Sequence, residues 1–187
     1  MSNLLFGNFF LNNSGTKSIS QKIIEKFQIE NIDFIIGSKI KNRFFRIIEI
    51  IFKVIFYRYK NIHVDVFSDN AFNVAILVCL LNKVRNKKII LNLRGGKLID
   101  FFHTKNNKCK FQFIFASAKK IVSPSNYLVD FFNSNNFNVE YLPNYIDFDN
   151  FPYNKKLVRN NKILWVRGFH KIYNPKDAVH ALFYLEK

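Results

Sequence analysis

Short apolar stretches alternate with stretches of helical periodicity over the first 142 residues. The apolar stretches are rich in β-branched and aromatic side chains, and six could form strands: residues 4–10, 33–37, 63–67, 88–93, 120–123 and 138–142. Helical patterns separate them, at residues 18–27, 41–60, 70–84, 111–118 and 125–133. Continuous apolar strands that alternate with helices are typical of a parallel sheet covered on both faces. We therefore expect an α/β fold with a doubly wound parallel sheet of six strands.

The pattern changes after Asn144. Residues 145–162 are polar, aromatic and irregular, as a surface linker would be. Residues 163–166 (ILWV) then favour a strand, and a helical pattern begins at Lys176. A chain of 187 residues is long enough for one domain of about 100–150 residues and too short for two. The predicted organisation is a domain over 1–144, a linker over 145–162 and the incomplete start of a second domain over 163–187.

Residues 39–60 predict a long helix with unequal faces. Its polar residues recur at three- and four-residue steps and form one narrow polar stripe: Asn42, Arg46, Glu49, Lys53 and Lys60. In one interpretation the broad apolar face packs on the sheet and the polar stripe lies in solvent. In the other, the helix lies on an anionic membrane surface, and the two interpretations are compatible. The side chains expected at such a surface are Arg43, Phe44, Phe45, Arg46, Phe52, Lys53, Phe56 and Arg58.

The chain carries a large excess of basic residues. Lys and Arg number 29 against 13 Asp and Glu, which gives a formal net charge of +16. This excess favours an anionic partner, such as a phosphorylated ligand, an anionic membrane surface or nucleic acid. The heavy use of Asn, Lys, Ile and Phe is also what an AT-rich coding sequence would give, so part of the charge needs no functional explanation. With 49% hydrophobic and 17% aromatic residues, the chain is expected to fold.

The sequence shows no sign of secretion or of a membrane span. Residues 1–15 have no basic region ahead of their apolar run, and no stretch offers about 18 uncharged apolar residues. Cys79 and Cys109 have neither metal-binding nor redox spacing, which fits a reducing compartment. We expect a cytoplasmic location, peripheral on the inner face of the cell membrane if the basic helix binds lipid.

In doubly wound folds, ligands bind beyond the carboxyl ends of the strands. Gly15 lies between the first strand and a helix expected to start near Thr16, and its loop could bring backbone N–H groups to a phosphate. Arg94, Gly95 and Gly96 follow a buried strand, and an arginine beside two glycines suits an anionic ligand. Each pattern has a plainer interpretation: a turn at Gly15 and a solvated arginine in a glycine turn.

The loop after the fifth strand predicts a helix start. Ser123 is the expected cap if Pro124 is the first helical residue, and the N–H groups around Ser125 could hold a phosphate. Asp65 and Asp69 flank the third loop, although capping explains Asp69 equally well. The four histidines show no ligand spacing, so no metal site is predicted.

The order of the motifs is more informative than any one of them. IVSPSNYLVDFF, VEYLPNYIDFDNF and ILWVRGFHKIYNPKDAVHAL follow one another along the chain. This order resembles the crossing between the two Rossmann-like domains of family 4 glycosyltransferases, which have the GT-B fold. The similarity is specific over about residues 120–182, and LNLRGGKL looks like the glycine turn of the same N-terminal domain. Arg94 stands where many members have a histidine, and Arg167-Gly168 stands where they have Gly-Arg.

The resemblance implies sugar transfer from a nucleotide sugar to an acceptor in cell-envelope or surface-polysaccharide synthesis, without a further cofactor. The first domain would bind a glycan or lipid-linked acceptor and the second the nucleotide sugar. The family's paired-glutamate motif for the donor would lie beyond Lys187, so we expect the truncated chain to be inactive alone. No catalytic base is assigned. With the loops above, the candidate substrate-binding residues are Gly15, Arg94, Gly95, Gly96, Ser125 and Arg167.

Two alternatives remain open. The first is a non-catalytic basic α/β module that binds an anionic membrane surface or a partner chain carrying the donor half. The second is a nucleic-acid-binding protein, which charge alone supports. No recognition helix or stacking platform is evident, so we expect no specific nucleic acid.

Overall fold

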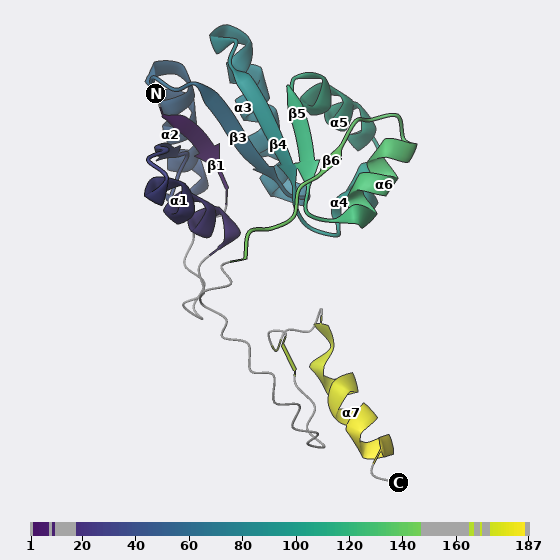
Figure 1. Ribbon diagram of the computed structural model, residues 1–187. Coiled ribbons are helices and arrows are strands. Elements are labelled where there is room, and N and C mark those ends of the chain that lie inside the picture. The colour runs from purple at the N-terminus through teal and green to yellow at the C-terminus, as the bar shows by residue number, and fades with distance from the viewer. Residues whose placement is uncertain are drawn as a thin grey trace. The chain divides into compact units, whose positions relative to one another are not determined.

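The computed structural model describes residues 2–7, 9, 18–146, 165–166, 169 and 173–185. The chain divides into two compact units, Met1–Ile146 and Asp147–Lys187 (Figure 1). The first unit holds a six-stranded sheet of order β2-β1-β3-β4-β5-β6, and every neighbouring pair is parallel. Each predicted strand has its counterpart, so the doubly wound α/β class is confirmed. The strands are β1 (Asn3–Phe6), β2 (Phe34–Ile36), β3 (Asn61–Val66), β4 (Lys88–Leu93), β5 (Lys120–Ser123) and β6 (Glu140–Tyr141).

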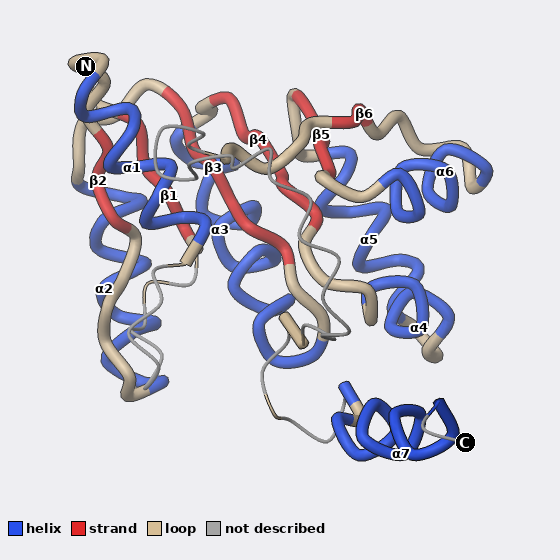
Figure 2. Tube along the Cα trace, turned by 60° about the horizontal axis from the view of Figure 1, so that its bottom comes forward, coloured by secondary structure: helices blue, strands red, loops and turns tan. Residues whose placement is uncertain are grey.

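The helices of this unit connect successive strands. They are α1 (Ile19–Ile29), α2 (Arg43–Phe56), the 3-10 turn η1 (Asp69–Ala71), α3 (Phe72–Arg85), α4 (Leu98–His103), α5 (Asn107–Ala116) and α6 (Asn126–Ser134). From β1 the chain moves to β2 at one edge, and all later connections move the other way. Because such crossovers are right-handed, α1 covers one face and the helices from α2 onward cover the other (Figure 2).

The buried side chains follow this division. Leu4 and Phe6 of β1 belong to a large core shared with α2 to α6. Leu5, which points to the opposite face, packs with Phe9 and Ile24 under α1. The large core is rich in phenylalanine, and Phe111 and Phe132 are fully buried with stacked rings 5.4 Å apart. Most of the buried apolar side chains thus lie on one side of the sheet.

Two predicted helix starts are wrong by a few residues. Helix α1 begins at Ile19 and not near Thr16, because Ser18 and Gln21 form a reciprocal capping box there. Helix α6 has Ser125 at its N-cap position rather than Ser123. The Ser123 hydroxyl instead donates to the Leu93 carbonyl at 3.2 Å, so it ties the end of β5 to the end of β4. In addition, residues 94–110, which precede the predicted helical pattern of 111–118, contain the short helix α4 and the start of α5.

Helix α2 corrects the interpretation that its polar stripe lies in solvent. Only Ile50 and Val54 are buried, and Arg46, Glu49 and Lys53 turn toward the protein and are partly covered. The apolar residues on the other side of the helix are exposed: Phe44, Phe45, Ile47, Ile48, Ile51, Phe52 and Phe56. Asn42 caps the helix, and Lys60 lies beyond its end. Periodicity identified the two faces but not which one the sheet would bury.

Most of the described residues of the second unit belong to one helix. Helix α7 (Pro175–Leu185) starts beside the predicted Lys176, and the backbone N–H of Asp177 donates to the carbonyl of Asn174 at 3.1 Å. Of the predicted strand 163–166, Ile163 and Leu164 lie outside the described residues, and Trp165 and Val166 are described but are not part of a strand.

Replacement of a core phenylalanine should destabilise the protein far more than replacement of an α2 phenylalanine. We expect Phe132→Ala to lower the free energy of unfolding by about 3–5 kcal/mol, because the change opens a cavity in the ring cluster. The matched control Phe44→Ala should change it by less than about 0.5 kcal/mol, since this side chain is 67% exposed. Urea unfolding followed by circular dichroism measures both. A large loss in the control would contradict the outward orientation of α2.

Candidate functional site

The strand order places a switch point between β1 and β3. The connection after β1 leaves toward one edge of the sheet and the connection after β3 leaves toward the other, so their loops diverge. Ligands of doubly wound proteins bind at such a point, beyond the carboxyl ends of the strands. An open pocket of about 680 Å³ lies here. Its lining includes Phe6, Gly7, Ser38, Arg43, Arg46, Ile47, Asp65, Phe67, Asn70 and Asn73.

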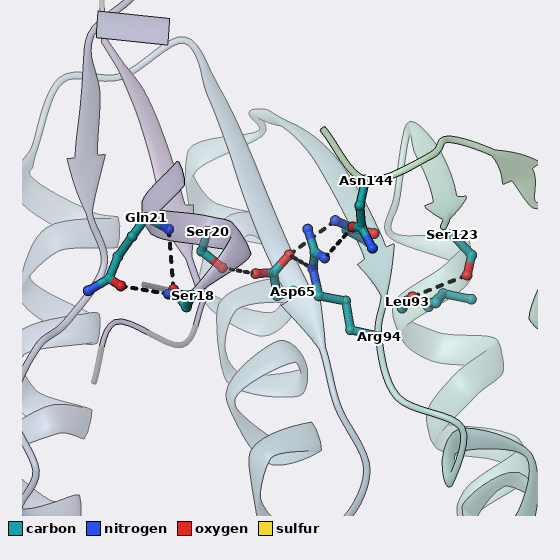
Figure 3. A network of polar contacts seen from close by, with 9 residues as sticks. Ser18, Ser20, Gln21, Asp65, Leu93, Arg94, Ser123 and Asn144 are labelled. Carbon is teal, nitrogen blue, oxygen red and sulfur yellow. Dashed lines mark hydrogen bonds and ion pairs between the residues drawn. The ribbon is translucent and has the colours of Figure 1, made fainter. Parts of the chain in front are cut away.

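Asp65, in the wall of this pocket, is the centre of a buried polar network (Figure 3). It lies opposite Asn92 in the β3–β4 register, and both side chains face the α1 side of the sheet. The Oδ1 atom of Asp65 accepts from Asn92 Nδ2 at 3.2 Å and from Arg94 Nε at 2.7 Å. The Oδ2 atom accepts from the Ser20 hydroxyl of α1 at 2.5 Å. The carboxylate therefore joins α1, β3 and the end of β4.

Arg94 extends the network to the segment that leaves β6. Its Nη1 atom donates to Oδ1 of Asn144 at 3.0 Å, and its backbone N–H donates to the Val66 carbonyl at 2.8 Å. One residue later, the Tyr145 ring lies under the Lys26 ammonium of α1, 5.6 Å from the ring centroid. Residues 144 and 145 thus run along the carboxyl ends of the strands from β4 toward α1.

Gly7 makes room for the contact between Ser20 and Asp65. A Cβ atom at Gly7 would lie 2.6 Å from Ser20 Oγ and 2.7 Å from Asp65 Oδ2, closer than such atoms approach. Glycine is needed here for the close approach of α1 to the end of β1, independently of the backbone angle.

The buried pair of Asp65 and Arg94 acts as a structural clamp. Both residues are buried, and each ion is stabilised by the other together with hydrogen bonds. Removal of one partner from such a pair leaves an uncompensated buried charge, which is strongly destabilising. The three donors on the Asp65 oxygens leave little capacity to take a proton from a substrate. We therefore assign Asp65 to positioning and not to base catalysis.

His63 lies two residues before Asp65 on the same face. Burial lowers the pKa of His63, and the nearby Asp65 charge opposes this shift only in part. Its ring packs edge-on against Phe34 of β2, with centroids 5.5 Å apart. The imidazole therefore resists protonation and is a packed group rather than an exposed cation.

Two α2 arginines, Arg43 and Arg46, line the pocket. Arg46 is committed to the loop before the helix, because its Nε and Nη2 atoms donate to the carbonyls of Ile40 and Lys41. Arg43 is exposed at the first position of α2. Lys53, another expected membrane-surface residue, instead donates to the Ile36 carbonyl and to Glu49. Burial raises the pKa of Glu49, but hydrogen bonds from Lys53 and Ser38 and the Lys53 charge outweigh it, so the net pKa is lowered.

The predicted substrate-binding residues that the structure describes do not gather in one place. Arg94 is not a lining residue of the pocket but donates to Asp65, which is one. Two of its three guanidinium nitrogens are engaged in hydrogen bonds, with Asp65 and Asn144. Gly95 has a φ of +99°, which favours glycine, and neither Gly95 nor Gly96 lines the pocket. Ser125 occupies the N-cap position of α6 without a side-chain cap hydrogen bond, and it does not line the pocket either. Gly15 and Arg167 lie outside the described residues.

Sequence reasoning missed Gly7, Ser20 and Asn144. A signal was available for the centre of their network, since Asp65 is an acidic residue inside a buried apolar strand and needs buried donors. Gly7 lies in the first apolar run, where a glycine often marks a close approach of another backbone. In the described part of the chain, no group of three or more His, Cys, Asp or Glu residues is arranged to hold a metal ion.

An added methyl group at Gly7 should disturb the network. We expect Gly7→Ala to lower the free energy of unfolding by about 1–3 kcal/mol, because Ser20 and Asp65 must move apart. Gly96→Ala is the matched control, since a Cβ there meets nothing within 4 Å and the change should stay within about 0.5 kcal/mol. Chemical denaturation measures both variants. Equal effects at the two glycines would mean that the approach of α1 to Asp65 is not tight.

The buried His63 should make stability depend on pH near neutrality. The unfolded chain takes up a proton near the ordinary value of 6.5, and the folded chain does so only at lower pH. The free energy of unfolding should therefore fall between about pH 7.5 and 5.5 and become independent of His63 below its folded-state pKa. In His63→Gln this fall should be smaller. Denaturation curves across this range test the difference, and identical pH profiles would contradict it.

Comparison with known proteins leaves the function open. No protein-family model matches the chain, and no curated protein matches it. The α/β fold is therefore established by the sheet itself, and the resemblance to family 4 glycosyltransferases rests on the motifs of residues 120–182.

Proposed function

We propose that residues 1–146 are the acceptor-side half of a glycosyltransferase. In this proposal the pocket at the switch point holds the sugar acceptor, and a second domain brings a nucleotide sugar to its mouth. The observation that carries the proposal is the position of the pocket, at the carboxyl ends of β1 and β3 where the chain reverses its direction of winding. The order of the motifs from β5 to α7 supports the reaction type.

The groups in the pocket suit a neutral, hydroxyl-rich acceptor. Asn70 and Asn73 offer two amides, which can both donate and accept hydrogen bonds. Ser38 lies beside them, but its hydroxyl is already engaged with the Ile40 backbone N–H and with Glu49. Phe6 and Phe67 add apolar surface beside them. A few placed polar groups in an otherwise apolar concave site are typical of small-molecule recognition.

The described residues contribute binding and orientation to the reaction. An acceptor hydroxyl would attack the sugar carbon of the donor, and the nucleoside diphosphate would leave with the bonding electron pair. Arg43, at the mouth of the pocket, can stabilise negative charge on the leaving group. Asp65 and Arg94 neutralise each other and hold the loops after β1, β3 and β4 in register. Of the glycines and arginines predicted to bind substrate, Arg94 has a positioning role, Gly95 and Gly96 do not line the pocket, and Gly15 and Arg167 lie outside the described residues.

Acceptor and donor probes should behave differently with this chain. We expect farnesyl-diphosphate-linked N-acetylglucosamine to shift the backbone amide signals of Gly7, Ser38, Asn70 and Asn73 in ¹H–¹⁵N spectra. UDP-glucose, UDP-N-acetylglucosamine and GDP-mannose should leave these signals in place. Asn73→Ala should weaken acceptor binding by up to about tenfold, the value of one hydrogen bond. The control Asn138→Ala, an exposed asparagine after α6, should bind like the parent chain.

Three results would count against the proposal. Nucleotide sugars that shift the pocket signals while acceptors do not would make this the donor side. A pocket that neither class of probe perturbs would remove the sugar-transfer proposal and favour the non-catalytic module. A preference for one nucleic-acid sequence would favour the nucleic-acid alternative.

A further inference from the structure

The outer face of α2 is apolar and exposed along the whole helix. We define it by Phe44, Phe45, Ile47, Ile48, Ile51, Phe52 and Phe56. At 100° per residue these side chains span about half of the helix circumference, and no charged residue interrupts them. Phe52 is 52% exposed and Phe56 66%. Contiguous exposed apolar surface of this kind marks an interaction site.

The helix is fixed in this orientation by its polar stripe. Lys53 donates to the Ile36 carbonyl at 2.8 Å and to Glu49 at 2.6 Å, and Arg46 holds the Ile40 carbonyl at 2.8 Å. A rotation that buried the phenylalanines would break these bonds and expose Ile50 and Val54. The outward apolar face is therefore built into the packing of α2 on the end of β2.

The surroundings of the outer face are basic. Lys39, Lys41 and Arg43 lie before or at the start of α2, Arg58 and Lys60 lie after its end, and all five are exposed. From residue 34 to residue 62 the sole acidic residue is Glu49, which is paired with Lys53. An apolar strip between two groups of cations matches the boundary of an anionic bilayer, with hydrocarbon between headgroup phosphates.

We propose that the outer face of α2 docks on an anionic lipid bilayer. The phenylalanine and isoleucine side chains enter the boundary between headgroups and acyl chains, and the cations at both ends contact lipid phosphates. The helix lies in the plane of the surface, over a length of about 21 Å for its 14 residues. This inference does not depend on the glycosyltransferase proposal.

A second copy of the chain fits this surface less well. Two α2 helices packed antiparallel across a twofold axis would bring Lys39, Lys41 and Arg43 of one copy against Arg58 and Lys60 of the other. The net charge of +16 adds to this repulsion, and the outer face offers no carboxylate to relieve it. Charge complementarity therefore favours lipid phosphate over another copy.

Docking through α2 would also set the position of the pocket. Arg43 and Ile47 belong to both α2 and the pocket lining, so the mouth of the pocket lies beside the outer face. An acceptor anchored in the same bilayer could then reach the pocket without leaving the membrane. This step rests on the proposed function, whereas the docking does not.

Vesicle binding tests the apolar part of the surface. The chain should bind vesicles of phosphatidylcholine with about 30 mol% phosphatidylglycerol, and it should bind vesicles of phosphatidylcholine alone far more weakly. Phe52→Ser combined with Phe56→Ser should weaken binding at least about tenfold, because two large apolar side chains no longer enter the lipid. The matched control replaces two exposed apolar residues elsewhere, Ile29→Ser with Tyr127→Ser, and should bind like the parent chain. Melting curves verify that all variants are folded.

Charge reversal tests the basic part with the net charge held equal. Lys39→Glu with Lys41→Glu should weaken binding to anionic vesicles at least about tenfold, and added salt should weaken binding of the parent chain. Lys105→Glu with Lys108→Glu changes the total charge by the same amount, on exposed residues at and just before the start of α5, and should have a much smaller effect. Equal losses in the two pairs would show attraction by net charge alone and would overturn the docking surface.

Other results would also overturn it. Full vesicle binding by the phenylalanine variant would mean that lipid does not contact α2. A dimer in light scattering that the same variant dissociates would assign the face to a second copy. The two proposals can fail separately. Asn73→Ala should lose acceptor binding and keep vesicle binding. The phenylalanine variant should lose vesicle binding and still bind a soluble acceptor.

Discussion

The buried ion pair between Asp65 and Arg94 is the constraint on which the first unit depends. The carboxylate is reached by donors from α1, from β4 and from the turn after β4, and through Arg94 it holds Asn144 beyond β6. An acidic group in a buried strand is costly unless such donors surround it, so the chain segments that supply them are fixed in position. The loops that frame the pocket are therefore held at its wall by one polar centre.

Hydrogen bonds of polar side chains also explain the unusual orientation of α2. A surface helix normally turns its apolar side inward. Here Arg46 and Lys53 satisfy carbonyls at the end of β2 and in the following loop, and the sheet needs only Ile50 and Val54 from the helix. Because these polar side chains face the protein, the apolar side chains on the opposite side of α2 face the solvent. The exposure of the α2 phenylalanines is thus a consequence of the hydrogen bonds that join the helix to the end of β2 and to the following loop.

The lining of the pocket and the outer face of α2 both include residues of the same helix. Hydrogen-bonding groups gather at the carboxyl ends of β1 and β3, and exposed apolar side chains lie on α2. In our two proposals, a membrane-anchored acceptor is presented to the pocket from the bilayer. Arg43 stands where these two surfaces meet.

The sequence by itself determined the strands, most of the helices and the doubly wound class, because apolar period and turn residues are local properties. It also marked Asp65 and Arg94 as polar residues beside buried strands. It could not place Gly7, Ser20 and Asn144 around Asp65, since these residues are far apart in the chain and meet only through the crossovers and strand order. Nor could it choose the buried face of α2. Hydrophobic periodicity fixes the angle between two faces of a helix. Which face turns to the protein was decided by the hydrogen bonds of Arg46 with carbonyls of the preceding loop and of Lys53 with the Ile36 carbonyl of β2.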